Sequence, residues 1–301
     1  KGRLKKDDSS VPVKRRNYFY YSRYESNKEF PVYCRRLGNM DAEEQIILDE
    51  NELSKGHDYY SLGGFSVSEN EQIVAYAEDT LSRRIYSIRF LDLKTGKKLP
   101  DVITGASTSM AWAADGKSFF YVDKDDKTLR PYSVRKHVLG TPQSADTVVH
   151  EENDESFYVG VGRSKSRRFI FIELQSTEVS EVRYIEASEP NRPFVPVIAR
   201  RPKIEYDVAH HGETFYIRTN EGAQNFKLMA APIATSEDPK SWTTVIDGRA
   251  DAMLDDIEVF KDYLVTAERI NGQRQLSVRK WSDMIAHPIE FNETVYTAFA
   301  G

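Results

Sequence analysis

Five segments decide the fold of this 301-residue chain: Ile73-Val-Ala-Tyr-Ala77, Phe119-Phe-Tyr-Val122, Phe169-Ile-Phe-Ile172, Thr214-Phe-Tyr-Ile217 and Tyr263-Leu-Val-Thr266. They are short apolar runs, most of them rich in the aromatic and β-branched residues that are typical of strands. Their starts lie 46, 50, 45 and 49 residues apart. That spacing matches the period of about 40–50 residues shown by the blades of β-propellers.

Turns and further strands accompany these segments. Asp115-Gly116 and His211-Gly212 precede two of them and supply the positive φ or the side-chain hydrogen bonds that a tight hairpin needs. A third strand with alternating polar and apolar residues follows in most units, as in Gln275-Leu-Ser-Val-Arg279. We therefore predict an all-β chain, a β-propeller of about six four-stranded blades. The predicted blades span roughly residues 17–50, 62–105, 108–150, 156–200, 205–247 and 254–297.

Some stretches fit the repeat less clearly. Residues 41–54 are compatible with either a helical turn or an outer strand, and the proline-rich residues 186–203 predict a loop with an edge strand. The last residues resemble a strand without a partner, and the first lack both an initiator Met and an apolar stretch. We expect a truncated propeller cut from a longer protein, with exposed edges that favour self-association.

Composition excludes several classes of function. The net charge is -5, with no basic stripe of the kind that binds nucleic acid. No apolar run approaches the roughly 18 residues that could span a membrane. The single cysteine, Cys34, can form neither an internal disulfide nor a cysteine zinc site, which favours a reducing, cytoplasmic setting.

A series of short motifs resembles the oligopeptidase B branch of the prolyl oligopeptidase family, and these motifs occur in the expected order over nearly the whole chain. They include Tyr20-Tyr-Ser-Arg-Tyr24, Gly56-His-Asp-Tyr-Tyr-Ser-Leu-Gly-Gly64, Tyr86-Ser-Ile-Arg-Phe90, Thr128-Leu-Arg-Pro-Tyr132, Glu152-Asn-Asp-Glu-Ser-Phe-Tyr-Val-Gly160 and Phe215-Tyr-Ile-Arg-Thr-Asn220.

The resemblance implies a longer parent enzyme. In that family a seven-bladed propeller caps an α/β-hydrolase domain with a Ser-Asp-His triad, and the propeller restricts access to short peptides, which are cut after Lys or Arg. The expected partners are therefore the chain's own C-terminal hydrolase domain and short basic peptides. The resemblance also places Asp58 and Arg84 at the contact between propeller and hydrolase; the alternative is an ordinary solvated charge pair.

The chain contains no Gly-x-Ser-x-Gly elbow to expose a nucleophile. The nearest stretch, Gly105-Ala-Ser-Thr-Ser109, lacks the final Gly, and we interpret it as a polar loop between blades. His57 is expected to pack or to form a hydrogen bond, and His210 and His211 are adjacent at a turn without further metal ligands. We predict no catalytic residue, metal or cofactor on this chain; a buried nucleophile hydrogen-bonded to an imidazole would contradict this interpretation.

Two charged runs and two rival functions remain open. The basic run 163–168 is interpreted as a solvated turn, with binding of an anion as the alternative. The acidic run 151–155 is a solvated loop or a region that steers basic peptides. The first interpretation is a gating role, in which the propeller restricts access to the hydrolase domain. There are two alternatives: a stand-alone propeller that serves as a protein-interaction scaffold, and a propeller that binds a small molecule or metal in its channel.

Overall fold

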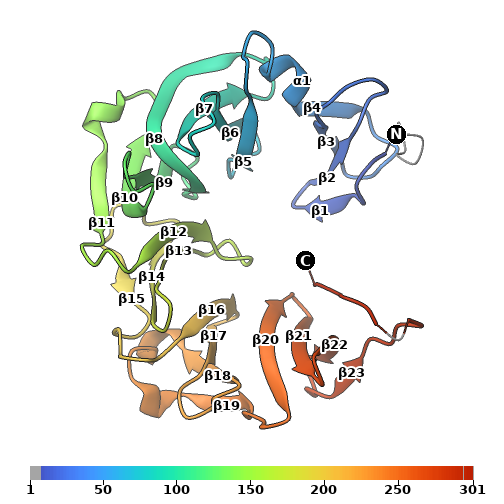
Figure 1. The fold of residues 1–301 in the computed structure, drawn as a ribbon, viewed down its shortest axis with the longest axis vertical. Helices are drawn as coiled ribbons and strands as arrows, with labels where there is room; N and C mark the ends of the chain where they lie inside the picture. The colour runs from blue at the N-terminus through green and yellow to red at the C-terminus, as the bar shows by residue number, and fades with distance from the viewer. Residues whose placement is uncertain (1–7, 294, 301) are drawn as a thin grey trace. The chain divides into compact units, whose positions relative to one another are not determined.

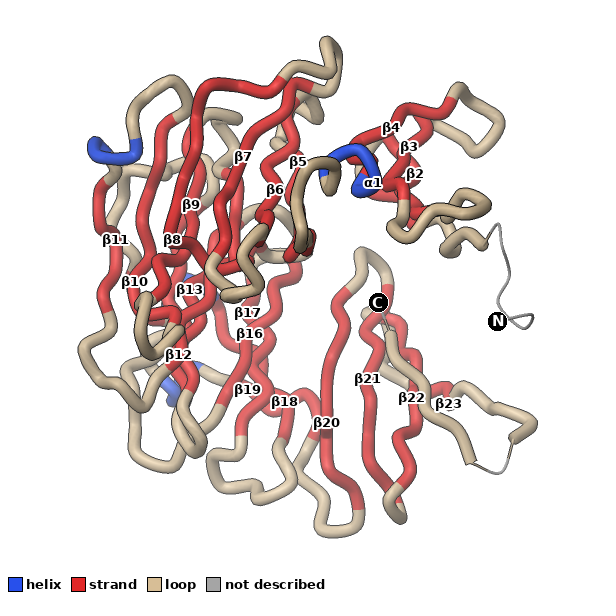
Figure 2. Tube along the Cα trace, turned by 45° about the horizontal axis from the view of Figure 1, so that its top comes forward, coloured by secondary structure: helices blue, strands red, loops and turns tan. Residues whose placement is uncertain are grey.

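The computed structural model describes residues 8–293 and 295–300, and it consists almost entirely of antiparallel strands (Figures 1 and 2). The predicted all-β fold is therefore confirmed. The chain divides into two compact units, each of which is described by itself. The first contains Lys1–Thr108, Lys124–Leu129 and Leu139–Ala145, and the second contains Ser109–Asp123, Arg130–Val138 and Asp146–Gly301.

The first unit begins with a four-stranded antiparallel sheet in the order β1-β2-β3-β4. Its strands are β1 Val13–Arg15, β2 Tyr18–Arg23, β3 Val32–Leu37 and β4 Glu44–Asp49. The helix α1 (Glu50–Leu53) follows at once, and the carboxylate of its N-cap Asp49 accepts a hydrogen bond from the amide of Asn51 at 2.9 Å. Residues 41–54 thus contain both the outer strand and the helical turn that their sequence allowed.

The next sheet starts in the same unit and continues into the second. Its strands are β5 Ser61–Val67, β6 Ile73–Asp79, β7 Tyr86–Asp92, β8 Lys98–Trp112, β9 Ser118–Lys124, β10 Pro131–Val138 and β11 Thr147–Glu151. They form one ladder in sequence order, because β8 is long enough to belong to two successive blades. The short 3₁₀ helix η1 (Gln143–Ala145) lies between β10 and β11.

The expectation of a polar loop at residues 105–109 was wrong, because these residues lie inside β8. Gly105 has φ +74°, a left-handed conformation that favours glycine, and the pairing of β7 with β8 contains two register shifts. These irregularities let one strand change direction without a break, and Figure 1 shows β8 as a long curved ribbon. The predicted break between residues 105 and 108 therefore falls within a strand.

The rest of the second unit contains three four-stranded antiparallel sheets, each in sequence order. Their strands are β12 Tyr158–Arg163, β13 Phe169–Gln175, β14 Ser180–Glu186 and β15 Val195–Pro196; β16 Tyr206–His211, β17 Thr214–Thr219, β18 Lys227–Pro232 and β19 Thr243–Ile246; and β20 Ala252–Val259, β21 Tyr263–Ile270, β22 Gln273–Lys280 and β23 Ala286–Pro288. Two further 3₁₀ helices, η2 (Ile233–Thr235) and η3 (Pro239–Ser241), separate β18 from β19.

The core of the second unit lies between successive sheets. Phe169 and Phe171 of β13 pack against Phe215 of β17, with ring centroids 5.2 and 6.0 Å from that of Phe215. Tyr184 of β14 contacts the same ring at 5.0 Å. The apolar second strands therefore bury their side chains against the neighbouring blade, which is why their sequences read as near-continuous hydrophobic runs.

The hairpin turns have the geometry that their residues predict. Gly116 and Gly212 have φ values of +65° and +62°. The carboxylate of Asp115 accepts hydrogen bonds from the amides of Lys117 and Ser118 at 2.9 and 2.8 Å. None of the described helices is long and apolar enough to cross a membrane.

Candidate functional site

The loops that carry Asp58 and Arg84 emerge at the same end of one sheet. Asp58 precedes β5 and Arg84 follows β6, and the start of β5 is paired with the end of β6 through Ser61 and Asp79. Both side chains are exposed. Within the described residues no ion pair joins Asp58 to Arg84, so each is a separate charge at this end of the sheet.

The loop that carries Arg84 is held rigidly by Asp79, which is buried. One carboxylate oxygen of Asp79 accepts a hydrogen bond from the amide of Leu81 at 2.9 Å, and the other accepts one from the amide of Arg84 at 2.7 Å. Ser82 and Arg84 have φ values of +56° and +55°, which cost free energy for residues with a side chain. The loop backbone is thereby fixed, and the guanidinium of Arg84 remains at the surface.

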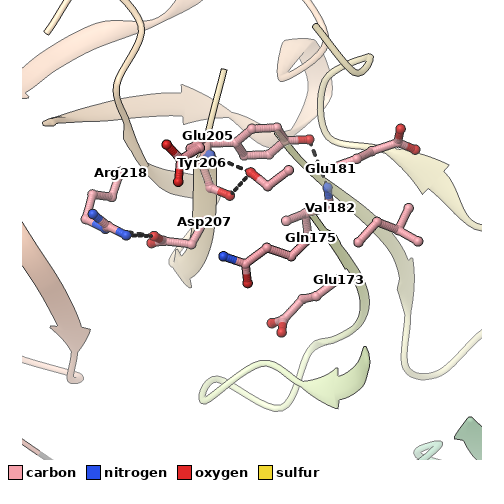
Figure 3. Close-up of a pocket in the computed structure, with 10 residues that line it drawn as sticks. Glu173, Gln175, Glu181, Val182, Glu205, Tyr206, Asp207 and Arg218 are labelled. Atoms are coloured by element: carbon pink, nitrogen blue, oxygen red, sulfur yellow. Dashed lines mark hydrogen bonds and ion pairs between the residues drawn. The ribbon is translucent and has the colours of Figure 1, made fainter. Parts of the chain in front are cut away.

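A second candidate site is a pocket in the second unit with a volume of about 180 Å³, between the sheet that contains β13 and β14 and the sheet that contains β16 and β17 (Figure 3). Four carboxylates and one guanidinium contribute to its lining: Glu173, Glu181, Glu205, Asp207 and Arg218. Figure 3 shows the Asp207–Arg218 pair on one side and Glu173 and Gln175 on the other. The pocket is therefore predominantly acidic.

Hydrogen bonds around Tyr206 fix the two walls of this pocket relative to each other. The hydroxyl of Tyr206 donates to the carbonyl of Ile198 at 3.0 Å and accepts from the amide of Val182 at 2.9 Å. The hydroxyl of Ser180 donates to the carbonyl of Tyr206 at 2.6 Å and accepts from its amide at 2.5 Å. Three of these bonds join β14 to β16, and the fourth ties Tyr206 to Ile198 just after β15, so the pocket is preformed.

The carboxylates differ in how well they are compensated. Asp207 accepts from Arg218 at 2.7 Å, and Glu181 accepts from Arg183 and Arg200 at 2.6 and 3.1 Å. Glu173 is an exposed residue at the mouth of the pocket and has no ion pair among the described residues. Desolvation, with the charge of Asp207 as a second cause, raises the pKa of Glu173. Glu205 also lacks an ion pair within the described residues, and its carboxylate accepts only from the side-chain amide of Asn220. A cation that enters the pocket would therefore meet two carboxylates without a cationic partner, Glu173 and Glu205.

This pocket was not predicted from the sequence. Glu173, Glu181 and Asp207 lie on three different strands, β13, β14 and β16, and Glu205 immediately precedes β16. The pairing of β13 with β14 and the contact of β14 with β16 bring them together. The short motif Glu205-Tyr-Asp207 carries two of the lining carboxylates on either side of the anchoring Tyr206, and this was the one local signal.

The two charged runs differ: most of the basic run is engaged in internal contacts, whereas the acidic run is exposed apart from Glu152. In the acidic run, Glu152 is buried and its carboxylate accepts from Arg200 at 2.5 Å. In the basic run, Lys165 pairs with Glu258 at 2.5 Å and lies 3.7 Å from the ring centroid of Phe260. Arg168 pairs with Glu186 and Glu213. The basic run thus contains a turn, as expected, but Lys165 and Arg168 are paired with glutamates and are not merely solvated.

The histidines occupy different environments. His57 is exposed, with its ring 6.0 Å from that of Tyr60. His211 stacks on Trp281 at 4.5 Å. His210 is buried and forms a hydrogen bond of 2.7 Å with the hydroxyl of Ser166. Ser166 is exposed and lies in a hairpin turn between antiparallel strands, so this pair is not the buried nucleophile of a hydrolase elbow.

A further buried pair escaped the sequence analysis. The Nδ1 atom of His137 lies 2.8 Å from the carboxylate of Asp146, which also accepts from the hydroxyl of Tyr121 at 3.0 Å. Both His137 and Asp146 are almost fully inaccessible to solvent. No group of three or more metal-ligating side chains occurs in the described part of the chain. The His137–Asp146 pair therefore belongs to the core and has no access to a substrate.

Comparisons with known proteins agree with this architecture. The family model "Prolyl oligopeptidase, N-terminal beta-propeller domain" matches residues 1–299. Two curated relatives are dipeptidyl aminopeptidase BI of Pseudoxanthomonas mexicana, 40% identical, and protease 2 of Moraxella lacunata, 33% identical; each match covers 98% of this chain and 43% of the relative. This chain thus spans less than half the length of those relatives.

Solved structures give the same result. Oligopeptidase B from Leishmania major superposes with a TM-score of 0.90 at 28% identity, over 98% of this chain and 43% of that one. Oligopeptidase B from Trypanosoma brucei superposes with a TM-score of 0.89 at 27% identity, over 98% and 42%. The chain belongs to the prolyl oligopeptidase family and corresponds to its N-terminal β-propeller domain.

Proposed function

We propose that this chain is the gating propeller of a serine peptidase that hydrolyses short peptides after Lys or Arg. A C-terminal α/β-hydrolase domain would supply the catalytic triad. The observation that supports basic substrates is the pocket between β13, β14 and β16, where four carboxylates face one guanidinium. A concave surface lined by one sign of charge concentrates ligands of the opposite sign. The propeller would thus select peptides by size and by charge.

A second candidate is a dipeptidyl aminopeptidase, which the 40% identity to dipeptidyl aminopeptidase BI favours. In that case the cation recognised by the acidic pocket would be the free amino terminus of the peptide. Basic peptides with blocked and with free amino termini distinguish the two proposals, because only the second requires the terminal ammonium group. The scaffold alternative receives no support from these curated relatives, whose names describe peptidases.

Glu173→Gln, introduced into the protein that carries the hydrolase domain, tests the role of the pocket. We expect KM for a Lys- or Arg-containing peptide to rise about five-fold, equivalent to ~1 kcal/mol for one weakly screened ion pair. The value of kcat should change little, because Glu173 would act when the peptide enters and not in the chemical step. Since the pKa of Glu173 is raised, its charge is lost at higher pH than that of an ordinary carboxyl. Wild-type KM should therefore rise as the pH falls through that pKa.

Glu237→Gln is the matched control, since Glu237 is exposed and lies outside the pocket. It should leave KM unchanged, and a neutral peptide should not distinguish Glu173→Gln from wild type. Selection by the pocket would be contradicted if Glu237→Gln raised KM for the basic peptide as much as Glu173→Gln does. It would also be contradicted if Glu173→Gln raised KM for the neutral peptide as much as for the basic one.

We further propose that Asp58 and Arg84 contact the hydrolase domain. The fixed backbone around Arg84 supports this, because a strained loop that presents an exposed guanidinium is suited to a bidentate contact. Arg84→Ala should lower kcat/KM by about five-fold and accelerate limited proteolysis between the domains, and Asp58→Ala should act in the same direction. Arg83→Ala, one residue away and also exposed, is the control. If Arg83→Ala has the same effect as Arg84→Ala, the specific contact is refuted.

A further inference from the structure

Ser166 and His210 form a hydrogen-bonded pair that the gating role does not use. Ser166 lies in the turn between β12 and β13, and His210 lies near the end of β16. Their side chains approach to 2.7 Å between Oγ and Nδ1. The Nε2 atom of His210 lies 2.8 Å from the carbonyl oxygen of Gly212. The pair adjoins a second pocket, with a volume of about 360 Å³, whose walls include Val259 and Phe260.

The hydrogen bonds fix the position of every proton in this group. A carbonyl oxygen can only accept, so Nε2 of His210 carries a proton and donates it to Gly212. In the neutral ring Nδ1 is then an acceptor, and the hydroxyl of Ser166 must donate to it. Burial lowers the pKa of His210, so the ring is neutral at pH 7.

Ser164 completes the chain of donors. Its hydroxyl oxygen accepts from the amide of Phe169 at 3.0 Å and lies 2.9 Å from the hydroxyl oxygen of Ser166. Because the proton of Ser166 is directed to His210, the hydroxyl of Ser164 is the donor to Ser166. The Oγ atom of Ser166 therefore has a base positioned to remove its proton, while the hydroxyl of Ser164 and, at 3.4 Å, the amide of Arg168 donate to the same oxygen and hold it in place.

The surroundings of His210 keep the ring in place. Phe169 and Phe215 flank it, with ring centroids at 4.8 and 5.9 Å. The charged groups that face it are Arg168, which lowers the pKa of His210, and Glu213 and Glu186, which raise it. Arg168 pairs with both glutamates, so these charges largely compensate one another. Ser166 itself is exposed and accessible to a reagent.

We propose that Ser166 is an activated serine that accepts one acyl or phosphonyl group from an activated electrophile, with His210 as the general base. With an alkyl fluorophosphonate, a bond forms between Oγ and phosphorus while the phosphorus–fluorine bond breaks. Fluoride leaves with the bonding electron pair. The hydroxyl proton passes to Nδ1 of His210 and then to water, so the step needs no other reactant. The proposal concerns a single covalent modification and is independent of peptide hydrolysis.

The test is labelling of residues 1–301 with an alkyl fluorophosphonate, followed by peptide mapping by mass spectrometry. We expect Ser166 to react about 100-fold faster than Ser282, the lower end of the range for general-base catalysis. Ser282 is exposed, and its hydroxyl donates to the carboxylate of Asp283 at 3.5 Å, with no imidazole beside it among the described residues. Mapping follows Ser166 alone, so a hydrolase serine in a longer form of the protein does not enter the measurement.

Variants and pH separate activation from simple exposure. Ser166→Ala should abolish the label, His210→Phe should reduce the rate at Ser166 to that of Ser282, and Ser282→Ala should have no effect on Ser166. A pH series on the wild-type protein tests the same point without a substitution that could affect folding. The rate of labelling at Ser166 should fall in acid, because His210 becomes protonated. Similar rates at Ser166 and Ser282, or a rate at Ser166 that His210→Phe leaves unchanged in a folded variant, would overturn the proposal.

Discussion

Phe215→Ala is expected to lower the free energy of unfolding by about 3–5 kcal/mol, the cost of removing a fully buried aromatic ring. Phe215 is inaccessible to solvent and lies at the centre of a cluster with Phe169, Phe171 and Tyr184. Because β13 and β14 belong to one sheet and β17 to the next, the substitution opens a cavity between two blades. The stability of a propeller depends on this contact between neighbouring sheets.

Urea denaturation followed by tryptophan fluorescence measures the effect, since Trp242 packs against the same cluster. The midpoint should fall while the slope with denaturant stays constant, which indicates a change in stability alone. Phe215→Leu keeps most of the volume and should cost less than about 1.5 kcal/mol. A loss from Phe215→Ala no larger than that from Phe215→Leu would show that the sheets do not depend on this ring.

The repeat of the second strands made the fold predictable from sequence, because buried strands leave continuous apolar runs at regular intervals. The continuity of β8 was not predictable in the same way. Residues 105–109 lack alternation and contain a glycine, so they read as a loop, whereas the structure uses the positive φ of Gly105 inside a strand. Local sequence cannot distinguish a bent strand from a loop when pairing with neighbouring strands determines which of the two forms.

The candidate sites were less accessible to prediction than the fold. The resemblance singled out Asp58 and Arg84, and the structure places their loops at one end of a sheet. Glu173 carried no signal, and the motif Glu205-Tyr-Asp207 did not reveal that Asp207 lies near it, because this proximity arises from the packing of two sheets. Ser166 and His210 were both within stretches noted for charge or for a turn, but their separation of 44 positions in the sequence hid their contact. Long-range contacts between antiparallel strands thus set the chemistry of this chain.

Peptide hydrolysis is expected to require residues outside this chain. The sequence has no Gly-x-Ser-x-Gly elbow, and the described residues form antiparallel sheets, whereas a hydrolase elbow joins a strand to a helix. Ser166 is activated in our proposal, but it lies in a hairpin turn, and an amide is a far less reactive electrophile than a fluorophosphonate. A form with the hydrolase domain should therefore hydrolyse the peptide at least about 10⁶-fold faster than this chain.

The most direct measurement is the release of a chromogenic amine from a Lys or Arg dipeptide amide by purified residues 1–301. The account predicts no release above the buffer blank, together with rapid release by the protein that carries the hydrolase domain. Turnover by residues 1–301 alone, especially turnover lost in Ser166→Ala, would contradict it.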